Sequence, residues 1–286
     1  MSASAPGIAV GGEKIRAART ARRWPWKLKI GLVIIAVFAL IAILAPVIAP
    51  FNPLAANPLD TLSPPGGNHL LGTDDLGRDE LSRLIYATRI DLPVCIAAAA
   101  FSALLGTVLG AVSGFAGGLL DTVVMRIADL VQAFPIYILL LALVFALGPG
   151  VKSFLIAYAV VDWVFYARLI RSEILRVKGL DYVAAARTAG FSNRRVLVMH
   201  ILPNTISQSV IYVMSDMVFA ILALAAFSFI GVGIAPPTAE WGAMTAEGQQ
   251  FLGVAWWLTV LPGVVIAIVA LVLSLIGDGL QDRLRS

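Results

Sequence analysis

Charged residues are scarce in this chain of 286 residues. They make up 13% of the sequence, whereas hydrophobic residues make up 59% and the mean hydropathy is +0.91. In soluble globular domains about a quarter of the residues are charged. The composition therefore excludes a soluble globular protein and predicts a chain that resides in a lipid bilayer.

Cysteine and histidine are also scarce. Cys95 is the single cysteine, which excludes an intrachain disulfide and a cysteine-based metal site, and its apolar surroundings predict a small buried residue. The two histidines, His69 and His200, leave too few ligands for a metal site. We therefore predict that this chain binds no metal.

A third absence concerns nucleotide chemistry. The sequence has no Gly-x-x-x-x-Gly-Lys-Ser/Thr phosphate loop. No group of residues in it suggests covalent chemistry either. We therefore predict that the chain is not an enzyme and binds no cofactor itself.

Long apolar runs, by contrast, are abundant. A helix needs about 20 apolar residues to cross a bilayer, whereas β-barrel strands would appear as short alternating segments. The sequence therefore predicts an all-α, polytopic membrane bundle of six transmembrane helices. The predicted spans are residues 30–49, 92–116, 122–147, 154–170, 206–230 and 254–276.

Positive charge indicates the orientation of the bundle, because Lys and Arg are retained on the cytosolic side of a membrane. Seven basic residues precede the first span, and seven more lie from Arg168, at the end of the fourth span, to Arg195, before the fifth. We therefore predict that both termini face the cytosol. The net charge of +4 then reflects topology, and nucleic acid is not an expected partner.

This orientation divides the chain into five parts. The segment 51–91 should be irregular in its first half and form a helix along the outer surface from Gly77 to Asp91. The parts are a basic cytoplasmic tail (1–29), a first transmembrane helix (30–50), an extracytoplasmic loop (51–91), a transmembrane core that includes a cytoplasmic loop at 173–204 (92–279), and a cytoplasmic tail (280–286).

The segment 173–204, between the fourth and fifth spans, has a helical pattern. Asp181 favours a helix start, the alanines after it leave a slim face, and Gly190 ends the helix. A second short basic helix is predicted over residues 193–200, before the chain re-enters the membrane at Pro203. The result is a helix–turn–helix element on the inner face of the membrane, sized to fit a groove on a partner protein.

Some ionisable residues lie inside the predicted spans, where a charge costs a few kcal/mol and normally faces protein or water. Asp216, flanked by Met214 and Met217, is a candidate for lining a path through the bundle, and a hydrogen bond to a neighbouring helix or subunit is the alternative. Arg126 and Asp129 are one helical turn apart and are predicted to pair.

Other span residues suggest packing. Asp162 either pairs with a neighbour or lines water, and the sequence does not choose between these. Gly106, Gly110 and Gly114 follow a small-residue spacing that lets helices approach closely in lipid. Close helix packing is the expectation there.

Three motifs carry a family resemblance over nearly the full length of the chain. They are Leu71-Gly-Thr-Asp-Asp-Leu-Gly-Arg-Asp79, the segment from Asp181 to Gly190 with its following His200-Ile-Leu-Pro-Asn204, and Ile276-Gly-Asp-Gly-Leu-Gln-Asp282. The chain resembles the second, C-type permease subunit of bacterial ATP-binding-cassette importers of the dipeptide, oligopeptide and nickel class. One departure is Asp181, where the family usually has Glu.

The resemblance implies a five-helix core preceded by one peripheral helix, in the bacterial inner membrane. It implies a homologous permease subunit, two ATPase subunits that bind ATP and Mg, and an extracytoplasmic peptide-binding protein. Peptides would cross by alternating access, with the 173–204 loop as a lever moved by the ATPases. Residues expected to contact the ATPase are Asp181, Tyr182, Ala185, Ala186, Gly190, Phe191, Arg194 and Arg195, of which the two arginines are also placed to bind acidic groups or lipid phosphate.

Other functions remain open at this point. Nickel or another small solute is the alternative substrate, although the chain offers few metal ligands. An ion-coupled secondary transporter would more often have an internal repeat and broken helices, and the sequence indicates neither. The segment 77–91 is a plausible landing site for the binding protein or a cap over the permease pair.

Overall fold

The computed structural model describes residues 24–285, and helices make up nearly all of its regular structure. Five of the described helices are long and apolar enough to cross a membrane. The predicted all-α membrane bundle is confirmed, whereas most of the predicted basic tail lies outside the described residues. The five helices are α1 (Trp26–Ile48), α2 (Glu80–Ala116), α5 (Val151–Lys178), α8 (Leu202–Phe229) and α10 (Trp257–Arg285).

The predicted third span, residues 122–147, is not one straight helix. It consists of α3 (Gly118–Gln132) and α4 (Ile136–Leu147), which bend by 89° at a short break. Pro135 explains the break, because proline lacks a backbone N–H and disfavours the helical conformation in the residue before it. The described chain has six spans if this bent pair counts as one, and the expectation that no helix is broken is wrong.

The helix α2 begins at Glu80, well before the predicted span 92–116. Asp79 caps it, since its Oδ2 accepts hydrogen bonds from the backbone N–H of Ser82 at 2.8 Å and from the Ser82 hydroxyl at 2.6 Å. The helix predicted along the outer surface at 77–91 is therefore the first part of α2, continuous with the span. The predicted boundary between loop and core falls inside one helix.

The predicted short helix at 193–200 is likewise not separate from the fifth span. α7 (Asn193–Arg195), a π-helical turn (Val196–Ile201) and α8 form one continuous helix. Pro203 lies near the start of α8, where its missing N–H and bulky ring would disturb a regular α-helix. The wider π turn just before it accommodates both.

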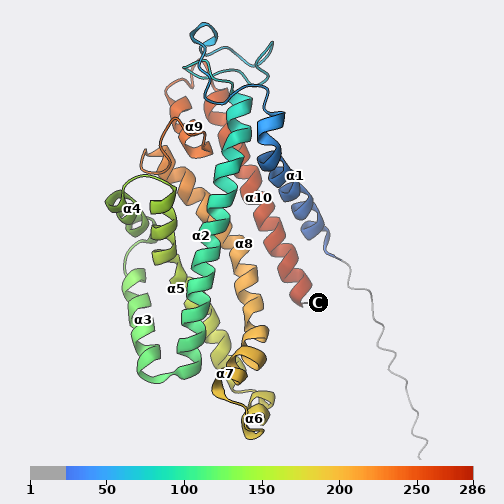
Figure 1. The fold of residues 1–286 in the computed structure, drawn as a ribbon, viewed down its shortest axis with the longest axis vertical. Coiled ribbons are helices and arrows are strands. Elements are labelled where there is room, and N and C mark those ends of the chain that lie inside the picture. Colours follow the sequence, from blue (N-terminus) through green and yellow to red (C-terminus); the bar gives the residue numbers. More distant parts are fainter. Residues whose placement is uncertain (1–23, 286) are drawn as a thin grey trace, which may run out of the picture.

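The helices α1 and α10 lie side by side at the edge of the bundle (Figure 1). Lys27 Nζ lies 3.4 Å from Asp278 Oδ2, and the Arg283 guanidinium lies 4.3 Å above the centre of the Trp24 ring. The start of α1 and the end of α10 are thus at the same end of the bundle. α10 continues to Arg285, so the segment predicted as a tail from residue 280 is helical over its described part.

The helix α2 runs through the middle of the bundle and packs along α5 (Figure 1). A Cβ atom at Gly106 would overlap the carbonyl oxygen of Trp163, and one at Gly110 would overlap that of Ala167. No other residue fits at these positions without moving the helices apart. The close packing predicted from the glycine spacing is confirmed.

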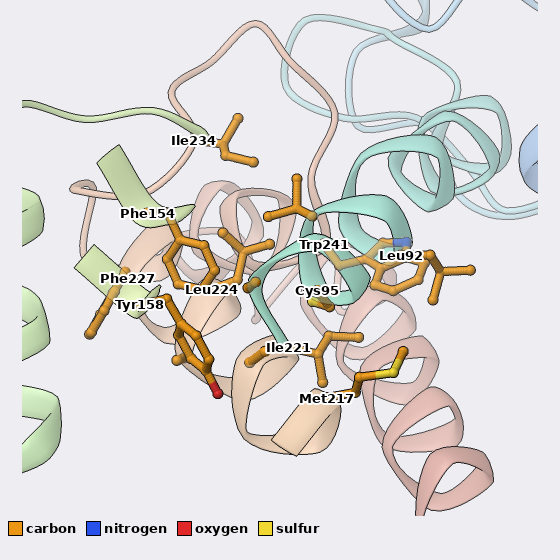
Figure 2. Close-up of a cluster of buried hydrophobic side chains, with 14 of the residues drawn as sticks. Leu92, Cys95, Phe154, Tyr158, Met217, Ile221, Leu224, Phe227, Ile234 and Trp241 are labelled. Carbon is orange, nitrogen blue, oxygen red and sulfur yellow. The ribbon is translucent and has the colours of Figure 1, made fainter. Parts of the chain in front are cut away.

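The two ends of the bundle differ (Figure 1). One end carries the loop 49–79 and α9 (Trp241–Gln249), and we call it the α9 end. The opposite end carries α6 (Asp181–Thr188), and we call it the α6 end. A large apolar cluster lies between α2, α5, α8 and α9, and in Figure 2 Phe154 and Tyr158 of α5 lie beside Phe227 of α8. Cys95 is buried in this cluster, as predicted.

Candidate functional site

The segment between α5 and α8 (residues 179–201) is the first candidate site, and we call it the α6 loop. Gly190 defines the end of the helix α6 within it. Gly190 has a φ of +81°, in the left-handed region. Its N–H donates to the carbonyl of Arg187 at 3.0 Å, and the N–H of Phe191 donates to that of Ala186 at 3.2 Å. This pair of bonds is the Schellman arrangement that commonly ends helices at glycine. The predicted helix stop is confirmed.

The inner face of α6 is fixed to the bundle by apolar packing. Val183 and Ala186 are buried in a cluster with Ile174 of α5 and with Val196 and Ile201 of the π-helical turn. Ala186 was predicted to contact a partner protein, but it faces inward and is 6% exposed. We assign it instead to the packing that holds α6 in place.

Polar contacts brace the same loop. The Tyr182 hydroxyl donates to the carbonyl of His200 at 3.2 Å. The side-chain amide of Asn204 donates to that carbonyl at 2.7 Å and to the Tyr182 hydroxyl oxygen at 3.2 Å. Tyr182 therefore ties the start of α6 to the start of α8. The residues His200 and Asn204 were noted only as part of a motif, and their bracing role could not be derived from spacing alone.

An aromatic stack completes the brace. The Phe191 ring stacks on His200 with centroids 5.5 Å apart and planes inclined by 17°. The Arg195 guanidinium lies 4.5 Å from the centre of the Phe191 ring on its face, a cation–π arrangement. Phe191 and Arg195 are thus engaged within the loop.

The outer face of the loop is exposed. The predicted contact residues that are exposed are Asp181, Tyr182, Ala185, Gly190, Arg194 and Arg195. A Cβ atom at Gly190 would meet no atom within 4 Å. Tyr182 and Arg195 are both exposed and part of the brace, which leaves Asp181, Ala185, Gly190 and Arg194 as an outward group outside the brace. Phe191 and Ala186 complete the bracing or buried group. Sequence periodicity did not separate the two groups, because the second group is defined by contacts with α5 and α8.

The predicted path residue Asp216 is the second candidate. It is fully buried, and its two carboxylate oxygens accept hydrogen bonds from the hydroxyls of Tyr158 at 2.6 Å and Tyr166 at 2.8 Å, both on α5. Its neighbour Met217 is buried in the apolar core, and Met214 is partly buried against α1 and α10. The hydrogen bond to a neighbouring helix, kept as the alternative, is what this arrangement provides.

The predicted pair Arg126 and Asp129 is present, with 3.6 Å between Arg126 Nη1 and Asp129 Oδ2. Asp129 also receives a hydrogen bond from Arg168 Nη2 at 2.6 Å, which links α3 to α5. All three side chains are at least 42% exposed. Such exposed pairs contribute little to stability.

A buried charge network connects the Leu71–Asp79 motif to α9. Asp74 is paired with Arg78, at 2.6 Å from Nε, and with Arg83. Both arginines also bind Glu247 of α9, at 3.1 Å and 2.7 Å respectively. Gly77 is required beside this network because its φ is +70° and a Cβ there would overlap the carbonyl of Asn57. The motif thus fixes the loop of the α9 end onto α9.

The start of α9 contains a second buried acid. Glu240 caps the helix by accepting hydrogen bonds from the backbone N–H groups of Gly242 at 2.9 Å and Ala243 at 2.7 Å. Burial nevertheless raises the pKa of Glu240 above its ordinary value. Asp91 of α2 lies close by and accepts a hydrogen bond from the Trp241 backbone N–H at 3.1 Å. The start of α9 is therefore joined to α2.

Comparison with known families matches most of the chain. A model of the binding-protein-dependent transport system inner membrane component matches residues 106–286. A model of the N-terminal transmembrane domain of oligopeptide transport permease C matches residues 29–65. Together they include most of α1, the end of α2 from Gly106 and the described helices from α3 onward.

The names of individual proteins with similar sequences agree with these family matches. The chain is 42% identical over 261 residues to the dipeptide transport system permease protein DppC of Haemophilus influenzae, covering 89% of this chain and 88% of that one. It is 38% identical to the protein of the same name from Alkalihalophilus pseudofirmus, with 89% and 84% coverage. It is 35% identical to the oligopeptide transport system permease protein OppC of Bacillus subtilis, also with 89% and 84% coverage.

Among solved structures, the inward-facing MetNI methionine ABC transporter contains a chain of the same fold. The TM-score is 0.56 at 16% sequence identity, covering 68% of this chain and 93% of that chain. The apolar helices, the family matches and these relatives identify a multi-pass inner membrane protein. The chain belongs to the family of binding-protein-dependent transport system inner membrane components.

Proposed function

We propose that this chain is a permease subunit of an ATP-driven importer of di- and oligopeptides. It forms half of the path across the membrane and receives mechanical work through the α6 loop. The relatives named as dipeptide and oligopeptide permeases support the peptide substrate over nickel. The observation that carries the coupling proposal is the α6 loop, which is braced internally and joined without a break to a membrane-spanning helix.

A coupling element must be stiff to transmit displacement. The buried apolar contacts of Val183 and the hydrogen bonds of Tyr182 leave α6 little freedom to move separately from the bundle. The helix from Asn193 to Phe229 continues from this loop to the region of α9. A push on the exposed face of α6 is therefore transmitted along α8. An eight-residue helix without these contacts would be marginal in water.

The proposed contacts with an ATPase subunit are the exposed residues of the loop outside the brace, Asp181, Ala185, Gly190 and Arg194. Small residues at two of these positions allow another backbone to come close. The partner ATPases would hold ATP and Mg, and this chain supplies only the receiving surface. Arg194 is also placed to pair with an acidic group or a lipid phosphate.

The orientation follows from this assignment. We place the α6 end in the cytosol, which agrees with the basic residues around it. The α9 end then faces outward, where a peptide-binding protein would deliver its cargo. A homologous permease subunit would supply the other half of the path, as the resemblance implies.

The function is tested by reconstituting the complex into liposomes with its binding protein. We expect uptake of a labelled dipeptide to require ATP and to be insensitive to ionophores that abolish ion gradients. Uptake that follows an ion gradient without ATP would refute the importer assignment. Nickel uptake with no dipeptide uptake would refute the substrate.

Cysteine labelling tests the orientation separately. Cys95 is buried, so its background reactivity is low, and Thr188 and Asn68 are exposed at the α6 end and in the loop of the α9 end. In intact cells a membrane-impermeant thiol reagent should label Asn68→Cys and leave Thr188→Cys unlabelled. The reverse pattern would contradict the proposed coupling role of α6.

A further inference from the structure

The break between α3 and α4 adjoins two cavities. They have volumes of about 160 Å³ and 280 Å³ and share Ile136, Val161 and Phe165 in their walls. Non-helical backbone at membrane depth is tolerated where it is buried in protein or lines a water-filled space. Broken helices in transporters commonly lie beside the solute. The cavities at this break are therefore candidates for part of the path.

Asp162 of α5 lies in the wall of the smaller cavity. It is 6% exposed, and its Oδ2 is buried with no hydrogen-bond partner among residues 24–285. The carboxyl group of Asp216 lies next to it, so the two acids form a hydrogen bond only when one of them carries a proton. Asp216 itself has two tyrosine donors, whereas Asp162 has none of this kind. A buried carboxylate oxygen without a donor is costly, and a ligand that brings N–H donors would relieve this cost.

The other walls of this cavity are largely aromatic. Tyr137, Phe165 and Tyr212 contribute rings from α4, α5 and α8, and Tyr158 lies beside them. Aromatic faces attract cations. One carboxylate among such rings matches a protonated amine in charge and in hydrogen-bonding capacity. A divalent metal ion would need several oxygen ligands, and no group of three metal-ligating side chains occurs in the described part of the chain.

We propose that Asp162 and the surrounding rings bind the primary ammonium group of the solute in transit. The proposal rests on the proposed function, in which the solute is a peptide with a free amino terminus. The smaller cavity has room for several waters, each of which takes about 30 Å³, so it holds one end of a peptide. The adjoining cavity of about 280 Å³ takes the next part of the chain.

Transport by the reconstituted complex provides the first test. Asp162→Asn keeps the side-chain volume and removes the charge. Hydrogen bonds to charged groups are among the stronger ones, so we expect dipeptide uptake to fall about tenfold or more, while complex assembly and the ATPase stimulation by the binding protein are retained. Asp129→Asn removes an exposed carboxylate on α3 and should transport normally. Undiminished uptake by Asp162→Asn would overturn the proposal.

A binding measurement with the purified complex separates this inference from the peptide assignment. Phe219 lines the cavity and is 54% exposed, so Phe219→Cys places a thiol in the wall while Asp162 stays intact. Glycinamide should slow the reaction of this thiol with N-ethylmaleimide, and N-acetylglycinamide, which has no ammonium group, should not. Adding Asp162→Asn should abolish the protection.

The outcomes of the labelling experiment are distinct. Equal protection by both amides, or none by either, would refute an ammonium site. Protection that survives Asp162→Asn would refute the role of this carboxylate. If the wild-type complex takes up no dipeptide but glycinamide still protects through Asp162, the proposed substrate is wrong and the ammonium site stands.

Discussion

Substitutions at Gly190 distinguish backbone strain from surface bulk in the α6 loop. Its φ of +81° is in a region that costs other L-residues about 1–2 kcal/mol, whereas Asn enters this region more readily. A Cβ atom at this position would meet nothing within 4 Å. Any loss of transport caused by a small side chain at this position therefore arises from backbone strain. Any further loss caused by a large side chain arises from its contact with a partner.

The expected order of transport activity among the Gly190 variants follows from these two effects. Gly190→Asn should transport nearly as well as the wild type. Gly190→Ala should weaken the two hydrogen bonds that end α6, and a cost of about 1–2 kcal/mol corresponds to a factor of 5–30 in the population of the ordered end. Gly190→Trp adds bulk on the outward face and should uncouple ATP hydrolysis from uptake while the chain still inserts in the membrane.

The assay is the ratio of dipeptide taken up to ATP hydrolysed in proteoliposomes, with the amount of assembled complex as the control. Normal coupling in Gly190→Trp would refute the docking role of this face. Equal defects in Gly190→Asn and Gly190→Ala would refute the argument from backbone strain, because these side chains differ chiefly in their tolerance of positive φ.

Further predictions concern stability, measured as thermal unfolding of the purified chain in detergent. Gly110→Leu should destabilise by about 1–3 kcal/mol or more through overpacking of α2 against α5, whereas Gly263→Ala, where a Cβ meets nothing within 4 Å, should be neutral or stabilising. Arg83→Met removes a buried charge that pairs with Asp74 and Glu247 and leaves Arg78 to pair with both, so it should cost up to about 3–5 kcal/mol, whereas Arg126→Met on the exposed surface should change stability by no more than about 0.5 kcal/mol. Burial raises the pKa of Glu240, so folding favours its protonated form. Its contribution to the free energy of unfolding is therefore complete below the ordinary pKa and is lost as the pH rises through the raised pKa. Glu240→Gln should reduce the loss of stability with rising pH. An unchanged dependence of stability on pH in this variant would contradict the role of Glu240.

Much of the fold followed from patterns that are local in the chain. Apolar runs predicted the spans, and the spacing of Gly106 and Gly110 predicted a close helix contact. Hydropathy averages over a window, however, and so it passed over the break at Pro135 although the proline was visible. The same averaging placed the start of α2 at the apolar residues and missed the cap at Asp79.

The candidate sites were only partly predictable. Asp216 was identified as an unusual buried acid, but its partners are 50 and 58 residues away along the chain, at Tyr166 and Tyr158. Asp162 was left undecided for the same reason. Nothing local in the sequence indicated that one of these two acids would have donors and the other would not.

The sequence by itself determined that this protein resides in a lipid bilayer, that it is helical and which family it resembles, because these properties depend on composition and on short motifs. The tertiary structure alone decided which residues of α6 face outward, which charges are paired and where the cavities lie. Each of these depends on side chains brought together from distant segments, such as Arg83 and Glu247, which are 164 residues apart. Their contact exists only after the helices have packed.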